Sequence, residues 1–377
     1  MTRRSTIALL ALLCGACQKD PAPSSATPTD DVPALTTAEP EGLDPDRSPS
    51  AIAFGSCLDQ SRPAPILTDV VAAAPDAMVL LGDNVYADAG SVADLERAYA
   101  ALGAMPVYQR LAAAVPVLAT WDDHDYGRND VGKEFELKAD SKRVMLDFFG
   151  EPADSPRRMR EGNYDAVVLG PEGERVQVLL LDTRWFRDPL VAGGVAKRYI
   201  PHEASGPTVL GEAQWAWLEE RLREPADVRF LVSSIQLIVG EHPFESWGLF
   251  PAERRRMFDL LAKTRAGGVI VVSGDRHRGE LSCAYDEAVG YPLLELTASS
   301  LNRPNHDLED NRFRIEGLPL VGEVNFGVAR FDWARRSVGL ALHGLGGEPL
   351  LEATVPLDVL QPGHGPEGVP GCEPLHR

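Results

Sequence analysis

The chain has 377 residues, of which 44% are hydrophobic and 25% are charged, and its formal net charge at pH 7 is −19. A chain of this length and composition can bury a substantial core. The acidic excess excludes binding of nucleic acid through a basic surface. If the protein acts on anions, bound metal cations must therefore supply the positive charge.

Residues 1–17 have the features of an export signal. Arg3 and Arg4 precede the apolar run 7–13, which is too short to span a bilayer. Small residues then lead to Cys17, as in a bacterial lipobox, so we predict that Cys17 is lipidated and anchors the protein to a membrane. The two arginines fit a twin-arginine signal as well as a generic basic region, so the export route stays open. We expect a location in the periplasm or at the cell surface.

The remainder divides into a tether, one domain and a tail. Residues 18–50 are rich in Pro, Ala, Thr, Ser and acidic residues, which predicts a disordered tether. No second linker is evident, so we predict one domain over residues 51–360, followed by a Pro- and Gly-rich tail over 361–377. In an oxidising compartment Cys283 and Cys372 could form a disulfide that holds this tail, but the sequence leaves their pairing open.

From residue 51 onward, short apolar runs alternate with segments whose apolar residues have helical spacing. The predicted strands are 51–56, 77–81, 115–120, 167–169, 176–182, 230–234, 269–272, 293–297, 325–332 and 337–343. The predicted helices are 65–74 (after an initial loop), 92–102, 107–114, 139–149, 211–222 and 252–263. The short turn between the fourth and fifth strands predicts an antiparallel pair. The pattern indicates an α/β fold with two packed sheets covered by helices.

Two of the predicted strands end in side chains that could serve either structure or chemistry. Cys57 follows the first strand, although a buried cysteine commonly packs as a small hydrophobic residue. Gly82 lets the backbone turn sharply after the second strand, so Asp83 and Tyr86 would leave its tip. A turn in which Asp83 caps a helix explains this second stretch equally well.

Two further strand ends are harder to explain by structure alone. The run 121–125, WDDHD, places three carboxylates and an imidazole within four positions, where they repel one another unless cations neutralise them. Asp275 and His277 lie two residues apart, so in an extended chain they share a face and can hold one ion. Because ligands of α/β proteins bind beyond the carboxyl ends of the strands, the four stretches together predict a metal centre.

These stretches resemble, in the same order, the motifs of the PhoD-like alkaline phosphatase family within the calcineurin-like metallophosphoesterases. The matching stretches are FGSC (54–57), LLGDNVY (80–86), TWDDHDYGRND (120–130), LLLDTRWFRD (179–188) and VSGDRH (272–277), with SSIQ (233–236) and EHPFESWGLFP (241–251) in support. The resemblance covers about residues 51–345. It implies a metallophosphoesterase-like αββα fold, which is a two-sheet sandwich flanked by helices, with a multinuclear site at the strand ends.

The resemblance also implies ferric iron and calcium as cofactors. The metal ligands that it implies are Cys57, Asp83, Tyr86, Asp123, His242, Asp275 and His277. Among these, Cys57 and Tyr86 would bind iron and Asp83 would bridge the ions. Asp123 and His124 match the superfamily's catalytic Asn-His pair, so His124 would contact phosphate and protonate the leaving oxygen.

The expected chemistry is hydrolysis by water that the ions activate, with in-line attack on phosphorus. A basic residue that should hold phosphate soon after the GDxxY motif is not evident. The candidates for that role are Arg128, Arg184 and Arg276. The side chains that could orient ligands or waters are Asp122, Asp125, Asn129 and Asp182.

Three functions remain open at this point. The sequence favours an exported phosphoric-ester hydrolase that acts on monoesters or diesters. A phosphodiesterase directed at phospholipid or teichoic-acid-like substrates is an alternative, because a membrane anchor would give it access. A surface-anchored binding protein without catalysis is the third, and the completeness of the predicted metal site argues against it. The sequence does not reveal the natural substrate or the oligomeric state.

Overall fold

The computed structural model describes residues 42–194 and 198–375. The predicted export signal with Cys17 and the tether up to residue 41 lie outside the described residues. None of the helices in the described part of the chain is long and apolar enough to cross a membrane.

The first of two large sheets has six strands in the order β14-β13-β12-β1-β2-β3. Its strands are β1 (Ala51–Gly55), β2 (Ala77–Leu81), β3 (Val117–Thr120), β12 (Phe326–Asp332), β13 (Ser337–His343) and β14 (Pro349–Pro356). β1, β2 and β3 are parallel to one another, whereas the three C-terminal strands continue the sheet in antiparallel fashion. The carboxyl ends of the three N-terminal strands therefore lie at one edge of the sheet.

The second sheet has seven strands in the order β15-β10-β11-β9-β8-β5-β4. Its strands are β4 (Asp165–Leu169), β5 (Val176–Leu180), β8 (Val228–Ser233), β9 (Val269–Ser273), β10 (Gly279–Tyr285), β11 (Pro292–Ala298) and β15 (Glu373–Pro374). β5, β8, β9 and β11 are parallel, and the predicted antiparallel pairing of β4 with β5 is confirmed. A separate two-stranded ribbon joins β6 (Val191–Ala192) to β7 (Tyr199–Ile200).

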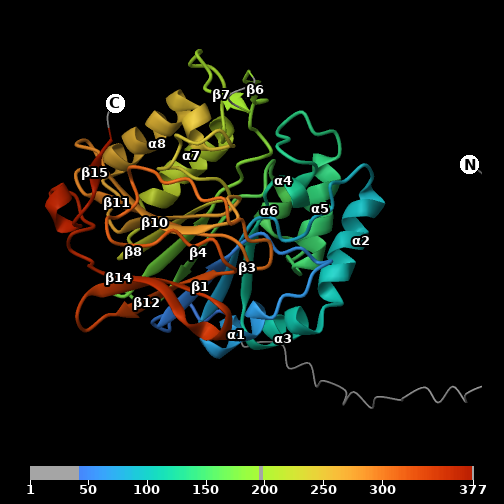
Figure 1. Ribbon diagram of the computed structural model, residues 1–377, viewed down its shortest axis with the longest axis horizontal. Helices are drawn as coiled ribbons and strands as arrows, with labels where there is room; N and C mark the ends of the chain where they lie inside the picture. The colour runs from blue at the N-terminus through green and yellow to red at the C-terminus, as the bar shows by residue number, and fades with distance from the viewer. Residues whose placement is uncertain (1–41, 195–197, 376–377) are drawn as a thin grey trace, which may run out of the picture. The chain divides into compact units, whose positions relative to one another are not determined.

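Helices cover the outer faces of both sheets (Figure 1). The helices packed on the first sheet are α1 (Ile66–Ala72), α2 (Val92–Gly103), α3 (Pro106–Ala114) and α5 (Lys138–Phe148). Those on the second sheet are α7 (Gly211–Leu222) and α8 (Pro251–Thr264). The shorter helices are α4 (Asp123–Tyr126), α6 (Pro156–Met159), η1 (Trp247–Leu249), η2 (Leu345–Gly347) and η3 (Pro366–Gly368).

The alternation of side chains along each strand produces these layers. In β1, Ile52 and Phe54 belong to the core cluster that joins the two sheets, whereas Ala51 and Ala53 belong to the cluster beneath α1, α2 and α3. The rings of Phe54 and Phe230 have their centroids 4.8 Å apart, so the sheets pack directly on each other. The predicted αββα architecture is confirmed.

The sequence pattern missed several elements. β10 and β14 were not predicted, and the polar run after β3, to which we assigned neither helix nor strand, contains the short helix α4. β10 carries Glu280 and Ser282 between apolar residues although every residue up to Ala284 is buried, because the sheet surroundings provide partners for Glu280. Local apolar patterning cannot reveal such a strand.

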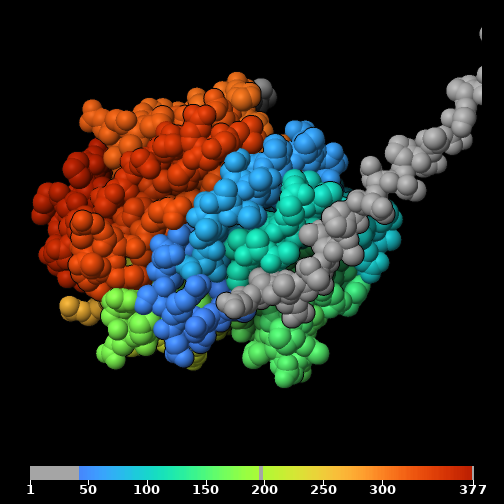
Figure 2. Space-filling view, turned by 90° about the horizontal axis from the view of Figure 1, so that it is seen from below, coloured from blue at the N-terminus to red at the C-terminus, as the bar shows by residue number. Residues whose placement is uncertain are grey.

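The described end of the predicted tether contacts the domain. Arg47 forms an ion pair with Asp76 at 2.7 Å, and the backbone N–H of Ser50 donates to the same carboxylate at 2.6 Å. The N–H of Gly170 donates to the carbonyl of Pro45 at 2.9 Å. In Figure 2 this segment lies on the molecular surface in dark blue. The folded unit therefore begins before Ala51, and residues 42–50 are part of it.

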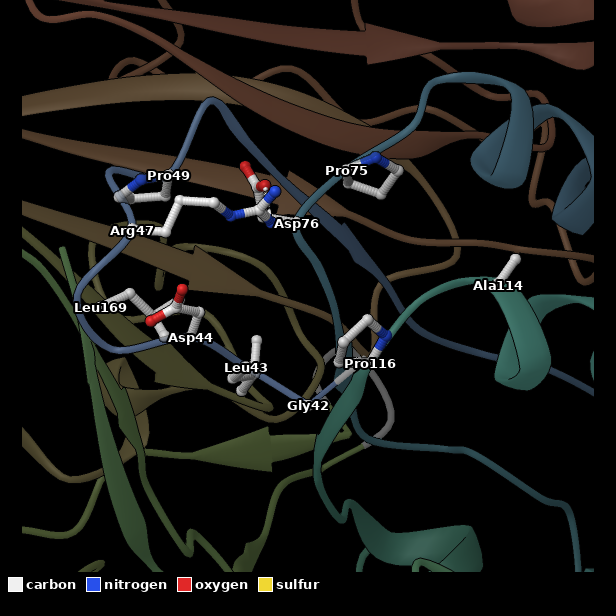
Figure 3. Close-up of a pocket in the computed structure, with 10 residues that line it drawn as sticks. All are labelled: Gly42, Leu43, Asp44, Arg47, Pro49, Pro75, Asp76, Ala114, Pro116 and Leu169. Carbon is white, nitrogen blue, oxygen red and sulfur yellow. Dashed lines mark hydrogen bonds and ion pairs between the residues drawn. The ribbon is translucent and has the colours of Figure 1, made fainter. Parts of the chain in front are cut away.

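These contacts enclose a cavity of about 240 Å³ at the amino ends of β2 and β3 (Figure 3). Leu43, Arg47, Asp76 and Pro116 line it, and the charged groups of Arg47 and Asp76 are paired with each other. This cavity lies at the end of the strands opposite to the one that carries the predicted ligands.

The C-terminal tail is also held. Cys283 in β10 forms a disulfide with Cys372, 89 residues later, and β15 pairs with β10 next to it. The pairing that the sequence left open is therefore present, and the folded unit extends past the predicted boundary at residue 360.

Removing this disulfide with the double substitution Cys283→Ser/Cys372→Ser should lower the free energy of unfolding by about 2–5 kcal/mol, because the bond restricts the unfolded chain. Urea unfolding followed by circular dichroism measures this. Reductant should lower the midpoint of the wild type and leave that of the double variant unchanged. Equal midpoints for the two oxidised proteins would contradict the prediction.

Candidate metal centre

The carboxyl ends of strands from both sheets meet at one place. Ser56, just after β1, forms a bridge with Ser299, just after β11, and the N–H of Leu301 donates to the carbonyl of Ser56 at 2.8 Å. Two glycines permit this approach. A Cβ on Gly274 would lie 2.7 Å from Ser56 Oγ, and one on Gly82, whose φ is +111°, would lie 2.6 Å from the Cβ of Asp122.

One group of donors joins three of the four predicted strand ends. Ligand atoms of Cys57, Asp83 and His277 lie within 4.8 Å of one another. The hydroxyl of Tyr86 lies 2.9 Å from Asp83 Oδ2 and 3.0 Å from His277 Nε2, so the phenol belongs to the same group. Cys57, which is buried, is the free cysteine of the described residues. A thiol, a phenol, an imidazole and a carboxylate are thus brought together.

A second group shares one carboxylate with the first. Ligand atoms of Asp83, Asp123 and His124 also lie within 4.8 Å of one another, so Asp83 belongs to both groups. One oxygen of Asp123 accepts the N–H of Asp130 at 2.6 Å, while the other, Oδ1, is buried without a hydrogen-bond partner in the described structure. An unpaired buried carboxylate oxygen is costly, and a cation would satisfy it.

A cleft of about 160 Å³ adjoins the two groups. Its lining includes Asp83, Asp123, His124, Asp275 and His277. The described residues that add further polar groups to its walls are Asn129, Asp130, Arg198, Tyr199, Glu245, Arg276 and Asn305. Asp130 and Glu245 lie within the matching stretches 120–130 and 241–251 but were not selected, and Arg198, Tyr199 and Asn305 lie outside every matching stretch.

The backbone is strained where the ligands leave their strands. Cys57, Asp83, Asp275 and His277 all have positive φ, between 50° and 60°. Non-glycine residues rarely adopt this left-handed conformation, and they keep it where the surrounding structure and function require it. The strain falls on four of the seven predicted ligands, which is what a preorganised binding site predicts.

The electrostatics of the folded chain call for cations. Burial, followed by repulsion from Asp123 and other aspartates, raises the pKa of Asp83 well above its ordinary value. Burial and neighbouring aspartates do the same to Asp275. Burial lowers the pKa of His277 to about 4, which keeps its imidazole in the neutral form that binds metals. Carboxylate oxygens suit calcium, and the thiol, phenol and imidazole suit iron, so the donor set fits both predicted cofactors.

The three candidate arginines have different positions. Arg184 is fully buried and pairs with Asp122 and Glu245, the latter at 2.6 Å, so it supports the fold and cannot reach a substrate. Arg128 is exposed, lies 5.5 Å from the ring centroid of Phe135 and does not line the cleft. Only Arg276 among the three lines the cleft. The assignment of phosphate binding to Arg184 was therefore wrong, because a local pattern cannot show burial.

His242 does not join either group. Its Nε2 lies 3.1 Å from Gln236 Oε1, and it lines a neighbouring cavity instead of the cleft. The loop after β8 therefore places this imidazole away from the other predicted ligands.

The four predicted supporting residues are close to the site, but they act in different ways. Asp122 accepts hydrogen bonds from Arg184 and Ser234, and Asp125 accepts from the backbone N–H of Asn84 at 3.1 Å. These bonds fix the two strand ends that carry Asp83 and Asp123. Asn129 lines the cleft.

Asp182 serves the fold instead of orienting ligands. It accepts from the indole of Trp121 at 2.8 Å and from the N–H of Asn163 at 2.7 Å. The bonds it makes in the described structure reach no predicted ligand.

Three contacts were missed by sequence reasoning. Asp88 Oδ1 lies 2.7 Å from His124 Nδ1, and its position two residues after Tyr86 could have suggested it. Ser299 Oγ lies 3.1 Å from Cys57 Sγ, and the guanidinium of Arg303 lies 4.0 Å from the ring centroid of Tyr86. The last two follow β11, a strand without a ligand motif, so only the fold reveals them.

Known proteins show the same combination of sequence and fold. The model of the PhoD-like phosphatase family matches residues 53–319. Alkaline phosphatase D of Bacillus subtilis (strain 168) is 25% identical over 195 residues, which cover 44% of this chain and 31% of that protein. The match thus spans about a third of the length of this curated relative.

Two solved structures share the fold. That of PhoD has a TM-score of 0.67 at 17% identity and covers 82% of this chain and 69% of its own. The structure of GAP50, the anchor in the inner membrane complex of Plasmodium, has a TM-score of 0.53 at 11% identity. The match covers 88% of this chain and 98% of the GAP50 chain. At these identities the likeness concerns the fold alone.

The substitution Arg184→Met should lower the free energy of unfolding by about 3–5 kcal/mol, because it leaves the buried carboxylates of Asp122 and Glu245 without their common partner. The matched substitution Arg128→Met removes an exposed guanidinium and should cost about 1 kcal/mol or less. Chemical denaturation of the three proteins tests this. Similar losses for both variants would contradict the buried pairing.

Calcium should stabilise the metal-free protein, and more strongly at pH 8 than at pH 5. The pKa values of Asp83 and Asp275 are raised in the folded chain, so the folded state holds protons that the unfolded state releases above about pH 4. The free energy of unfolding of the metal-free protein therefore falls as pH rises. A bound cation offsets the repulsion between the carboxylates, and calcium at one hundred times its dissociation constant raises the free energy of unfolding by about 2.7 kcal/mol. Thermal unfolding with calcium or chelator measures the gain, which Asp83→Asn should abolish. An equal gain at both pH values would contradict this account.

Proposed function

Because the chain belongs to the PhoD-like phosphatase family, we propose that it is a metal-dependent hydrolase of phosphoric esters. The observation that carries the proposal is the position of Asp83, whose carboxylate belongs to two adjoining groups of ligand atoms. Two cations that share one carboxylate can neutralise a phosphate ester between them. The acidic surface of the protein supplies no comparable positive field.

In this proposal Cys57, Tyr86 and His277 would hold ferric iron, and Asp83 would be shared between the ions. Asp123 and Asp275 would complete the ligands, and calcium would be the second metal. The short contacts of the phenol with Asp83 and His277 support the first set. The unpaired Oδ1 of Asp123 supports its role as a ligand. When bound, the ions would withdraw charge from the phosphoryl oxygens and lower the pKa of the attacking water.

His124 would donate a proton to the leaving oxygen. Its Nδ1 lies 2.7 Å from the carboxylate of Asp88, which can only accept a hydrogen bond when ionised, so Nδ1 carries the proton in that pairing. Asp88 would thus orient the ring, and Nε2 would be the atom that gives a proton to the leaving oxygen. The ring of Tyr86, 4.3 Å away between centroids, packs beside it.

Arg276 would hold a non-bridging phosphate oxygen. It lines the cleft, and its guanidinium lies 4.4 Å from the ring centroid of Phe244, which restricts its position. A guanidinium matches the geometry of phosphate oxygens.

We also propose that the enzyme acts outside the cytoplasm, anchored through a lipid on Cys17. The lipobox-like signal carries this part of the proposal. The disulfide between Cys283 and Cys372 supports it, because such bonds persist in oxidising compartments.

The proposal is tested by loading the purified protein with iron and calcium and following release of nitrophenol from nitrophenyl phosphate and from its bis-ester. We expect turnover of at least one, loss of turnover with chelator, and a decrease of kcat by about 10²–10⁴ in His124→Gln. The matched variant His364→Gln changes an exposed histidine of the tail and should retain activity. No turnover by the metal-loaded protein would refute the proposed function.

Metal analysis of the same sample separates the ligand assignment from the activity. Iron should be present with a visible charge-transfer band that Tyr86→Phe removes. A colourless, iron-free and active protein would refute the roles of Cys57 and Tyr86 without refuting hydrolysis.

A further inference from the structure

A second cavity, of about 250 Å³, adjoins the metal centre. Arg276 lines both the cleft of the metal centre and this cavity, so one guanidinium borders the two spaces. Arg278, His242, Gln236 and Glu309 contribute to the walls of the second cavity. A group bound there would therefore lie within reach of a phosphate bound at the metal centre.

In the second cavity, two buried cations form ion pairs with one exposed carboxylate. The side chains of Arg276 and Arg278 are each 4% exposed, and both pair with Glu309, at 3.3 Å and 3.0 Å. Glu309 itself is 47% exposed. The Nε atoms of both arginines are buried without a hydrogen-bond partner in the described part of the chain. Both guanidinium groups contact the same exposed carboxylate, so an anion that displaces Glu309 gains two buried cationic partners.

The nearby carboxylates have hydrogen-bond or ion-pair partners of their own, although Asp275 and Glu280 also balance part of the charge of Arg276. Glu280 accepts from the amide of Gln236 at 2.7 Å and from that of Asn311 at 2.5 Å. The remaining acidic side chains on these walls form ion pairs on the rim, Glu241 with Arg312 and Asp310 with Arg314. Asp275, which precedes Arg276 in sequence, faces the metal centre.

A neutral imidazole faces the same two cations. Burial, followed by repulsion from Arg276 and Arg278, lowers the pKa of His242 to about 2, so its ring stays uncharged. His242 therefore adds no charge of its own to the cavity, and it lies there instead of among the predicted metal ligands.

The carboxylate that neutralises the arginines lies on a segment that can be displaced. Residues 303–311 contain neither helix nor strand. The segment is attached at its start by the N–H of Asn305, which donates to the carbonyl of His277 at 2.8 Å, and at its end by Asn311. Between these attachments the backbone carbonyl of Glu309 accepts from the guanidinium of Arg278 at 2.6 Å, so the exposed side chain of Glu309 can rotate away while the backbone stays in place.

We propose that Arg276 and Arg278 form an anion subsite beside the metal centre, which Glu309 occupies in the free protein and a second anionic group of the substrate occupies in the complex. This deepens the proposed function and rests on it. The preferred substrates are phosphoric esters whose leaving group carries a further phosphate or carboxylate. A linker of a few atoms is enough, because Arg276 borders both spaces.

The test compares three esters of the same chain length: propyl phosphate, 3-phosphooxypropanoate and propane-1,3-diol bisphosphate. With the metal-loaded protein, kcat/KM should be at least about tenfold higher for the two esters that carry a second anionic group, because that group gains charge-assisted hydrogen bonds. The carboxylate and bisphosphate esters show which anion the subsite prefers.

Variants on either side of the subsite make the test specific. The ratio compared is kcat/KM for an ester with a second anionic group divided by kcat/KM for propyl phosphate. Arg278→Gln should bring this ratio close to one, whereas Glu309→Gln should raise it. Because Glu309 is half exposed, its variant should fold even if that of Arg278 does not. The matched variant Arg312→Gln removes a guanidinium that directly follows this segment and pairs with Glu241, and it should leave the ratio unchanged. An unchanged ratio in both Arg278→Gln and Glu309→Gln would overturn the subsite.

A binding measurement separates this proposal from hydrolysis itself. If no ester turns over, the proposed function fails, and the subsite is then judged by calorimetric titration with propane-1,3-bisphosphonate. Binding to the metal-loaded wild type about tenfold tighter than to Arg278→Gln supports the subsite. Equal affinities overturn it, whatever the activity.

Discussion

The structure of this protein depends on the crowding of carboxylates where the strands of two sheets end. Asp83, Asp122, Asp123 and Asp125 are buried within a short distance of one another, and Asp275 lines the same cleft. Charges of one sign packed in this way oppose folding unless protons, arginines or metal ions neutralise them. The family membership, the strained backbone of the ligands and the free oxygen of Asp123 are consistent with neutralisation by metal ions.

The buried guanidinium of Arg184 neutralises part of this negative charge. Arg184 lies beneath the run 121–125 and pairs with Asp122 and Glu245, and Ser234 donates to Asp122 from the second sheet. This network connects the ends of both sheets without entering the cleft. Asp83 and Asp123 are left to face the cleft where cations would lie. Asp122, which Arg184 neutralises, and Asp123, which a metal ion would neutralise, are therefore neighbours in the sequence.

The two adjoining cavities also differ in how their charged side chains are paired. The metal centre is rich in carboxylates, whereas in the adjoining cavity two buried arginines contact the one carboxylate of Glu309, and Arg276 borders both. A substrate with two anionic groups would find metal cations on one side and guanidinium groups on the other. In the proposed complex, such a substrate would have cationic partners although the formal charge of the protein is −19.

The sequence by itself determined the αββα fold class, most strands and helices, the family and most of the predicted ligands. It could do so because apolar strands and the polar residues directly after them are local features, and their order along the chain is preserved in the fold. Cys57, Asp83, Tyr86, Asp123, His124 and His277 were selected in this way, and the structure brings them together in two groups with Asp83 in common. β10 was missed because it carries buried polar residues such as Glu280, whose partners Gln236 and Asn311 come from distant loops.

Only the tertiary structure decided which charged side chains are buried and which face a cavity. Arg128, Arg184 and Arg276 look alike in sequence, but one is exposed, one is enclosed between Asp122 and Glu245, and one lines the cleft. The contacts of Ser299, Arg303 and Glu309 likewise arise between segments far apart in the chain. The physical reason is that burial and charge pairing depend on which segments pack together, and no local pattern contains that information.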